Sequence, residues 1–199
     1  IYRHSVHSMR IFPMRCKDFK MNQNKPPTKI AGAVCGAVAL VLGVAAIAVP
    51  KWLVLDLGFA QVTYGLWTAC ATVSVAGVVE CGSYTQIPGW VIATAALEVA
   101  GICETFVAVL FALLHISFAK NSKVAGKLPG PFAAAGGVLM IVGAIIWAVK
   151  YNDDANLVLC SLSVGFILAI VSAILSFIAG ILLFLGWRTE SREQPHTGF

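Results

Sequence analysis

Charged residues are scarce in this sequence. They make up 12% of its 199 residues, while hydrophobic residues make up 59%. Soluble domains carry about 25% charged residues, so this chain has too little charge to cover a water-facing globule. The composition therefore excludes an ordinary soluble domain. The length allows one domain, and no linker divides the chain.

Motifs for catalysis are also missing. The sequence contains no metal-ligand cluster, no nucleophile–base pair and no phosphate-binding loop, and its four histidines are scattered. It also contains no N-x-S/T sequon, which excludes an N-linked glycan. We therefore expect no enzymatic activity, no cofactor and no bound metal.

Long apolar runs are the dominant feature of what is present. The first run, 30–49, has no charged residue, and at 1.5 Å per residue it covers about 30 Å, the thickness of the hydrocarbon layer. Four such runs predict transmembrane helices over 30–49, 91–118, 132–149 and 162–187. They leave predicted extracellular loops at 50–90 and 150–161, a basic and disordered cytoplasmic tail at 1–29, and a short cytoplasmic tail at 188–199.

The basic residues set the predicted orientation. Of the 14 lysines and arginines, twelve lie in the two tails and the loop 120–131, while Lys51 and Lys150 lie in the other two loops. Positively charged segments stay on the cytoplasmic side, so both termini are predicted to be cytoplasmic. The net charge of +5 is thus a topology signal and a contact for anionic lipid, and we expect no nucleic-acid partner.

A cleaved signal peptide is the alternative for the first run, because the small residues Ala46 and Ala48 resemble a cleavage site. The run is longer than the usual 7–15 residues of a signal peptide. Cleavage would also leave three spans and place the basic loop 120–131 outside. We therefore predict four spans.

The loop 50–88 has the composition of a small antiparallel sheet. It is rich in β-formers on both sides of Cys70, and small residues lie where a turn is needed before Cys81. Ten residues separate the two cysteines, which suits a bridge between neighbouring strands. Because the outside of the cell is oxidising, we predict a Cys70–Cys81 disulfide.

The order of residues in this loop resembles the signature of the claudin, PMP22, EMP and MP20 superfamily. That signature is a tryptophan, then Gly-Leu-Trp, two residues, a cysteine, about ten residues and a second cysteine. The residues that carry it here are Trp52, Gly65, Leu66, Trp67, Cys70 and Cys81. The resemblance covers essentially residues 29–187. It implies an all-α membrane protein, a left-handed four-helix bundle with a small extracellular antiparallel β-sheet from the first loop and the end of the third span.

The resemblance also implies roles for these residues. Trp52 and the pair Leu66 and Trp67 would anchor the sheet in the outer leaflet, and the disulfide would clamp it. The implied function is a structural protein of cell–cell junctions in the plasma membrane, acting in adhesion and as a paracellular barrier. Such a protein would self-associate in the membrane plane and across the gap between cells.

Two other functions stay open. One is an auxiliary subunit that modulates a channel or receptor, as in the calcium-channel γ branch of the superfamily. The other is a membrane organiser like PMP22 and EMP, which the short loop 50–88 favours. The chain ends in Thr197, Gly198 and Phe199, a pattern that suits capture by a PDZ scaffold protein, although it is loose enough to be an ordinary tail.

Several charged and small residues have two interpretations. Asp56 and Glu80 in the first outer loop could line a pore for cations, or they could be ordinary surface charges, which we favour. Glu98 and Glu104 lie within the second span on different faces. A proton or ion relay would need them aligned, so we expect instead that they form buried hydrogen bonds with neighbouring helices. Small residues repeat in the spans, which indicates close packing within the bundle or, alternatively, lateral self-association.

Overall fold

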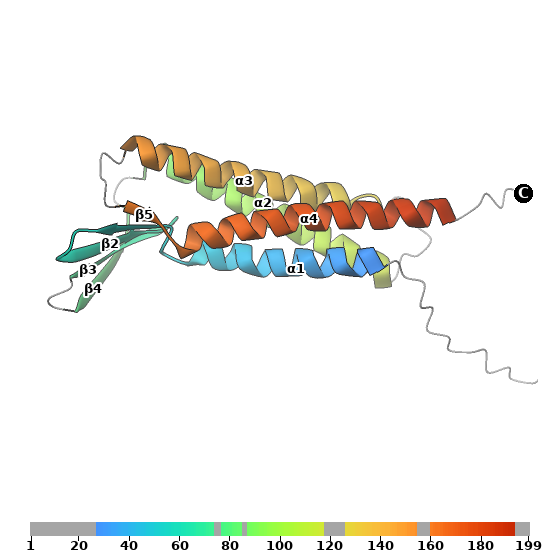
Figure 1. Cartoon of the computed structure of the whole chain (residues 1–199), viewed down its shortest axis with the longest axis horizontal. Coiled ribbons are helices and arrows are strands. Elements are labelled where there is room, and N and C mark those ends of the chain that lie inside the picture. Colours follow the sequence, from blue (N-terminus) through green and yellow to red (C-terminus); the bar gives the residue numbers. More distant parts are fainter. Residues whose placement is uncertain (1–26, 74–76, 85–86, 118–125, 155–159, 194–199) are drawn as a thin grey trace, which may run out of the picture.

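The computed structural model describes residues 27–73, 77–84, 87–117, 126–154 and 160–193 (Figure 1). The candidate PDZ ligand Thr197, Gly198 and Phe199 lies outside the described residues. So does most of the predicted N-terminal tail.

Four long helices make up the bundle. They are α1 (Pro27–Ala48), α2 (Gly89–Ser117), α3 (Pro129–Asp154) and α4 (Val164–Glu193). Each is long and apolar enough to cross a bilayer, and each overlaps one predicted span. α1 begins earlier than the predicted span 30–49, at a proline, which is well suited to the first turn of a helix. Lys29 is therefore part of a helix and not of a tail.

The helices are arranged as a four-membered bundle with the sheet at one end. α1 packs on α4, α2 on α3, α3 on α4, and α1 on α2. The start of α1 and the end of α4 lie at the end of the bundle opposite the sheet (Figure 1). We refer to these two ends as the sheet end and the opposite end.

Small residues bring the helices close together inside the bundle. A Cβ atom on Gly101 of α2 would lie 2.6 Å from the carbonyl oxygen of Gly136 of α3, and a Cβ on Gly136 would lie 2.6 Å from the carbonyl oxygen of Gly101. Only glycine permits this reciprocal contact between two backbones. Gly32 meets Leu183 and Gly180 meets Ala134 in similar close contacts. The small residues therefore serve packing within the bundle, the first of the two predicted uses.

Hydroxyl groups of α4 hydrogen-bond to each of the other three helices. Ser172 donates to the carbonyl oxygen of Ala39 in α1 at 2.7 Å. Ser176 donates to the carbonyl oxygen of Ala133 in α3 at 2.9 Å and lies 2.8 Å from the hydroxyl of Thr105 in α2. Such hydrogen bonds substitute for the hydrophobic driving force that is absent between helices in lipid.

A five-stranded antiparallel sheet extends from the sheet end. Its strands are β1 (Leu53–Asp56), β2 (Ala60–Tyr64), β3 (Thr68–Val73), β4 (Val78–Ser83) and β5 (Cys160–Leu162), in the order β4-β3-β2-β1-β5. The fifth strand was expected from the end of the third span, and this was wrong. α3 stays helical to Asp154, and β5 is supplied by the segment before α4, where Leu162 pairs with Leu53.

Candidate functional site: the junction of sheet and bundle

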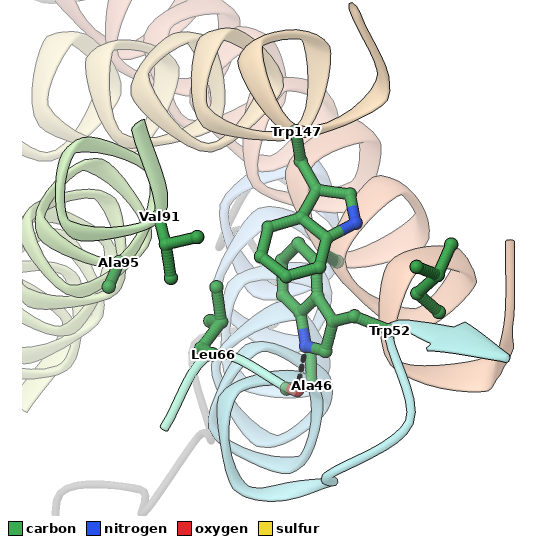
Figure 2. Packing of buried hydrophobic residues seen from close by; sticks show 8 residues of the cluster. Ala46, Trp52, Leu66, Val91, Ala95 and Trp147 are labelled. Carbon is green, nitrogen blue, oxygen red and sulfur yellow. Dashed lines mark hydrogen bonds between the residues drawn. The ribbon is translucent and has the colours of Figure 1, made fainter. Parts of the chain in front are cut away.

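Trp52 joins the sheet to the bundle. It lies between α1 and β1, its side chain is 0% exposed, and it packs among buried residues of all four helices (Figure 2). Its ring meets Trp147 of α3 edge to face at 5.2 Å between centroids, and Phe166 of α4 at 6.3 Å. Trp52 therefore fills the sheet end of the bundle.

The indole of Trp52 also caps α1. Within a helix, the carbonyl of Ala46 would accept from the backbone nitrogen four residues later, but that residue is Pro50, which has no N–H. The Nε1 atom of Trp52 donates to this carbonyl oxygen at 2.8 Å (Figure 2). The tryptophan thus satisfies an acceptor that the proline leaves without its helical donor.

Trp67 provides a second cap one residue further along α1. Its Nε1 atom donates to the carbonyl oxygen of Ile47 at 2.9 Å, although its side chain is 51% exposed. Trp67 lies in the turn between β2 and β3, so this hydrogen bond ties the turn to the last residues of α1. The two signature tryptophans therefore share one structural task, which is capping the end of α1.

Gly65 and Leu66 fit the same turn against the bundle. A Cβ atom on Gly65 would lie 2.6 Å from the Cα of Pro50, so only glycine lets the turn approach the end of α1. Leu66 is buried in the cluster around Trp52. The hydroxyl of Tyr84 donates to the carbonyl oxygen of Gly65 at 2.6 Å. Burial, and to a lesser degree the nearby Tyr64, raises the pKa of Tyr84 to about 12.

Backbone hydrogen bonds connect this junction to α4. The nitrogen of Ser163 donates to the carbonyl oxygen of Trp52 at 3.0 Å, and the nitrogen of Gly165 donates to that of Lys51 at 2.8 Å. A Cβ atom on Gly165 would lie 2.5 Å from the Trp52 ring, so the start of α4 needs a glycine. The sheet is consequently held at a defined position on the bundle.

These contacts correct the predicted anchoring role of two signature residues. Trp52 and Leu66 were expected in the outer leaflet, but both side chains are buried in protein and present almost no surface to lipid. Trp52 lies inside for two reasons: its Nε1 atom donates a hydrogen bond to the carbonyl oxygen of Ala46, and its ring fills the space between the helices. Lipid contact by the exposed ring of Trp67 stays a prediction.

The disulfide lies on the far side of the sheet from the β5 edge. Cys70 and Cys81 are directly opposite each other on β3 and β4, with an S–S distance of 2.09 Å and a Cα–Cα distance of 4.1 Å. The predicted bridge is confirmed. All six residues of β4 are exposed, so burial contributes little to holding this edge strand in place. The disulfide attaches it covalently to β3.

Comparison with protein families agrees with this architecture. The family model described as PMP-22/EMP/MP20/Claudin matches residues 29–183, from the first turn of α1 almost to the end of α4. The chain belongs to the PMP-22/EMP/MP20/Claudin family. It is accordingly a multi-pass protein embedded in the bilayer, and the suspected resemblance is confirmed.

The two candidate pore charges of this claudin-family chain do not form one site. Asp56 lies on β1 and Glu80 on β4, with two strands between them. Register pairs Glu80 with Ala71, Ala71 with Val62, and Val62 with Leu55, the residue before Asp56. Because successive residues of a strand point to opposite faces, the two carboxylates lie on opposite faces of the sheet. Asp56 also accepts a hydrogen bond from the nitrogen of Gly58 at 2.9 Å, as a turn residue does.

The two glutamates of α2 differ from the prediction in one respect. Glu98 is fully buried against Gly143 of α3, while Glu104 is half-buried. Among the described residues, neither carboxyl oxygen of Glu98 has a hydrogen-bond partner, and Oε2 of Glu104 has none either. The expected hydrogen bond is therefore wrong for Glu98 in this part of the chain, and wrong for one of the two oxygens of Glu104.

Sequence reasoning missed two parts of the molecule. Tyr84 carried no motif, since its partner is a backbone carbonyl 19 residues away. Lys29 and His115 form a buried contact across 86 residues, which no local pattern predicts for a residue assigned to a tail. By contrast, the role of Trp52 had a readable signal, because Pro50 follows Ala46 by four residues.

Proposed function

We propose that this protein is a claudin-like structural protein of cell–cell contacts, acting in adhesion and as a paracellular barrier. In this proposal the sheet lies outside the cell and meets the sheet of a molecule on the opposing cell. The bundle fixes the sheet in place, and lateral contacts between copies extend the contact along the membrane.

The observation that carries the proposal is an apolar tip on the sheet, away from the bundle. The β1–β2 turn, the end of β3 and the start of β4 lie at the end of the sheet remote from the helices (Figure 1). The large apolar side chains exposed at this tip are Leu57, Phe59, Val73, Val78 and Val79. Phe59 is 68% exposed and Val79 is 59% exposed. These exposed apolar side chains support the proposal, since apolar surface patches often mark protein–protein contact sites.

The rigidity of the junction supports the same function. Two indole caps, the Gly65 turn and the backbone hydrogen bonds to α4 hold the sheet on the bundle. A fixed sheet presents the same surface on every molecule and loses little conformational entropy on contact. The separation of Asp56 from Glu80 on opposite faces favours a barrier over an ion pore, since one chain does not bring the two charges together.

The proposal includes a plasma-membrane location with both termini in the cytoplasm, supported by the distribution of basic residues. It also includes capture of the tail ending in Phe199 by a PDZ scaffold. Because the small-residue faces of the helices are occupied within the bundle, lateral self-association would rest on the outward-facing side chains of the spans.

The test is imaging of tagged protein in dispersed cells that lack junctions of their own and are then allowed to touch. We expect accumulation at contacts between two expressing cells and not at contacts between an expressing and a non-expressing cell. The double variant Phe59→Ser with Val79→Thr should reach the surface without accumulating at contacts. Ile87→Ser, an exposed apolar position away from the tip, is the matched control and should behave like the wild type.

An even surface distribution of the wild type would contradict the proposal. Recovery of a stoichiometric channel or receptor partner on purification would then favour the auxiliary-subunit alternative. Accumulation of the tip variant at contacts would show that adhesion does not use the tip.

A further inference from the structure

A carboxyl group lies in the middle of α2, on a side of the helix that is partly open to lipid. Glu104 is 15 residues from Gly89, where α2 begins, and 13 residues from Ser117, where it ends. At 1.5 Å per residue these separations are about 22 Å and about 20 Å. Glu104 therefore lies well inside a hydrocarbon layer that is about 30 Å thick. The contact between sheets outside the cell has no use for this group.

One oxygen of this carboxyl group is unsatisfied. The Oε2 atom of Glu104 is covered by protein and has no hydrogen-bond partner within the described part of the chain, while the side chain as a whole is half-buried. A polar group in hydrocarbon is costly without such a partner, because no water is present to supply one. Glu98 is fully buried, so a second molecule does not reach it. Of the two glutamates of α2, Glu104 is the one that a neighbouring helix can contact.

The surface of α2 around Glu104 consists of small side chains. Ala96 and Ala100 are exposed and precede Glu104 by eight and four residues, so the three residues follow one ridge of the helix. Ala93 and Cys103 are exposed beside this ridge. Among the described helix residues, exposed small side chains recur at spacings of three and four only in α2. Such side chains let a second helix approach closely in lipid. We refer to these five residues as the Glu104 face.

A second copy of the chain carries the group that matches this face. The exposed and half-buried positions within 30–48 of α1, 131–149 of α3 and 164–186 of α4 carry no charge, hydroxyl or side-chain amide. A neighbouring copy therefore meets the mid-span Glu104 with a polar side chain only through its own α2. Copies in one membrane have the same orientation, so a twofold axis along the membrane normal places both Glu104 side chains at the same depth. Two carboxyl groups that hold at least one proton between them hydrogen-bond to each other.

We propose that two copies of this chain pair laterally through their Glu104 faces, with the two Glu104 carboxyl groups hydrogen-bonded to each other. Ala96 and Ala100 let the two α2 helices approach, and the surrounding lipid keeps water away from the pair. The choice of a second copy as the partner rests on the proposed function, which includes lateral contacts between copies. The inference adds the surface that makes one of these contacts.

The experiment is oxidative cross-linking in the membranes of dispersed cells that do not touch. The chain carries Cys16→Ser, Cys35→Ser and Cys160→Ser, so Cys103 is the thiol left beside the Cys70–Cys81 bridge. Copper phenanthroline is the oxidant, and the readout is the fraction of disulfide-linked dimer on a non-reducing gel. We expect a dimer linked through Cys103. A reference chain with Cys103→Ser and Val138→Cys, an exposed position on α3, should give little dimer.

Four substitutions test the hydrogen bond and the close approach. Glu104→Leu should reduce cross-linking about fivefold, as expected for the loss of one hydrogen bond between helices. Glu104→Gln keeps a donor and an acceptor and should retain most of the cross-linking. Ala100→Leu puts a large side chain at an exposed position of the face and should also reduce it, which tests the face even where Glu104→Leu does not fold. Phe106→Leu is the matched control: Phe106 is exposed, lies about 200° around the helix from Glu104, and should tolerate the change.

Other results would overturn the proposal. Unchanged cross-linking in Glu104→Leu, or equal losses in Glu104→Leu and Glu104→Gln, would show that a hydrogen bond does not hold the pair. Equal dimer formation by the Val138→Cys chain would show random collision. A cross-link from Cys103 to a different protein would show that the face binds another membrane protein.

The assay separates this pair from the proposed adhesion, because the cells do not touch. A Cys103-linked dimer without accumulation of the protein at cell contacts would support the lateral pair and contradict the adhesion. Accumulation at contacts without the dimer would overturn the lateral pair and leave the adhesion in place.

Discussion

Replacement of Trp52 by phenylalanine should destabilise the protein more than the same replacement at Trp147. Both side chains are almost completely buried, and they touch each other at the sheet end. They differ in one respect. The Nε1 atom of Trp52 donates to the carbonyl oxygen of Ala46, whereas the Nε1 atom of Trp147 has no hydrogen-bond partner among the described residues.

The hydrogen bond to Ala46 determines how much more stability Trp52→Phe should lose than Trp147→Phe. Each substitution loses about 1 kcal/mol of apolar burial from the smaller ring. Trp52→Phe also leaves the carbonyl oxygen of Ala46 without a donor, because residue 50 is a proline, and a buried unsatisfied acceptor costs about 1–3 kcal/mol. Trp147→Phe removes a buried donor that has no partner in the described part of the chain, which offsets part of its loss. For a chain of this length, 1–3 kcal/mol corresponds to a melting temperature roughly 2–12 °C lower for Trp52→Phe than for Trp147→Phe.

The assay is thermal unfolding of the purified variants in one detergent, followed by the loss of the monodisperse peak on size-exclusion chromatography. Trp67→Phe serves as a second comparison, because its ring is half exposed and its hydrogen bond is more accessible to water. We expect it to be less destabilising than Trp52→Phe. Equal melting temperatures for Trp52→Phe and Trp147→Phe would refute the capping argument.

Four more predictions follow from particular contacts. Cys70→Ser should cost roughly 2–3 kcal/mol and make the β4 edge sensitive to limited proteolysis, and an unchanged cleavage pattern would count against the bridge as a clamp. Gly136→Ala should abolish the monodisperse species because of its backbone contact with α2, while Gly82→Ala, which has open space around it, should have no effect. Glu98→Leu should melt at the same temperature as the wild type or higher, since it replaces a buried carboxyl without a described partner; a lower value would reveal a missing interaction. Tyr84 should ionise near pH 12, as measured by phenolate absorbance of the wild type minus that of Tyr84→Phe, and its contribution to stability should be complete below pH 10 and lost between about pH 10 and 12.

The bundle and most of the sheet could be predicted from the sequence for simple physical reasons. An apolar run such as 30–49 is stable across a bilayer as a helix, because a helix satisfies the backbone hydrogen bonds within the segment. The cysteine spacing and the β-formers around Cys70 were sufficient to predict paired strands with a bridge. Family resemblance added the order of the signature residues, and the family match supports it.

The remaining features depended on contacts that local sequence does not carry. β5 is three residues long, and its pairing with β1 joins positions more than a hundred residues apart. Trp52 has the amphipathic ring that favours a membrane interface. Pro50 marks the uncapped end of α1 in the sequence, but the space between the helices that the Trp52 ring fills is not visible there. The contact between Lys29 and His115 exists only because the start of α1 and the end of α2 meet there.

The proposed contact function requires the sheet to lie outside the cell. The decisive measurement is labelling of intact cells with a membrane-impermeant maleimide, using Phe59→Cys at the sheet tip and Arg188→Cys at the opposite end, with the parent chain as the background control. We predict labelling of Phe59→Cys in intact cells, and labelling of Arg188→Cys only after permeabilisation. Labelling of Arg188→Cys in intact cells, with Phe59→Cys protected, would show that the sheet lies inside the cell and would contradict the proposed function.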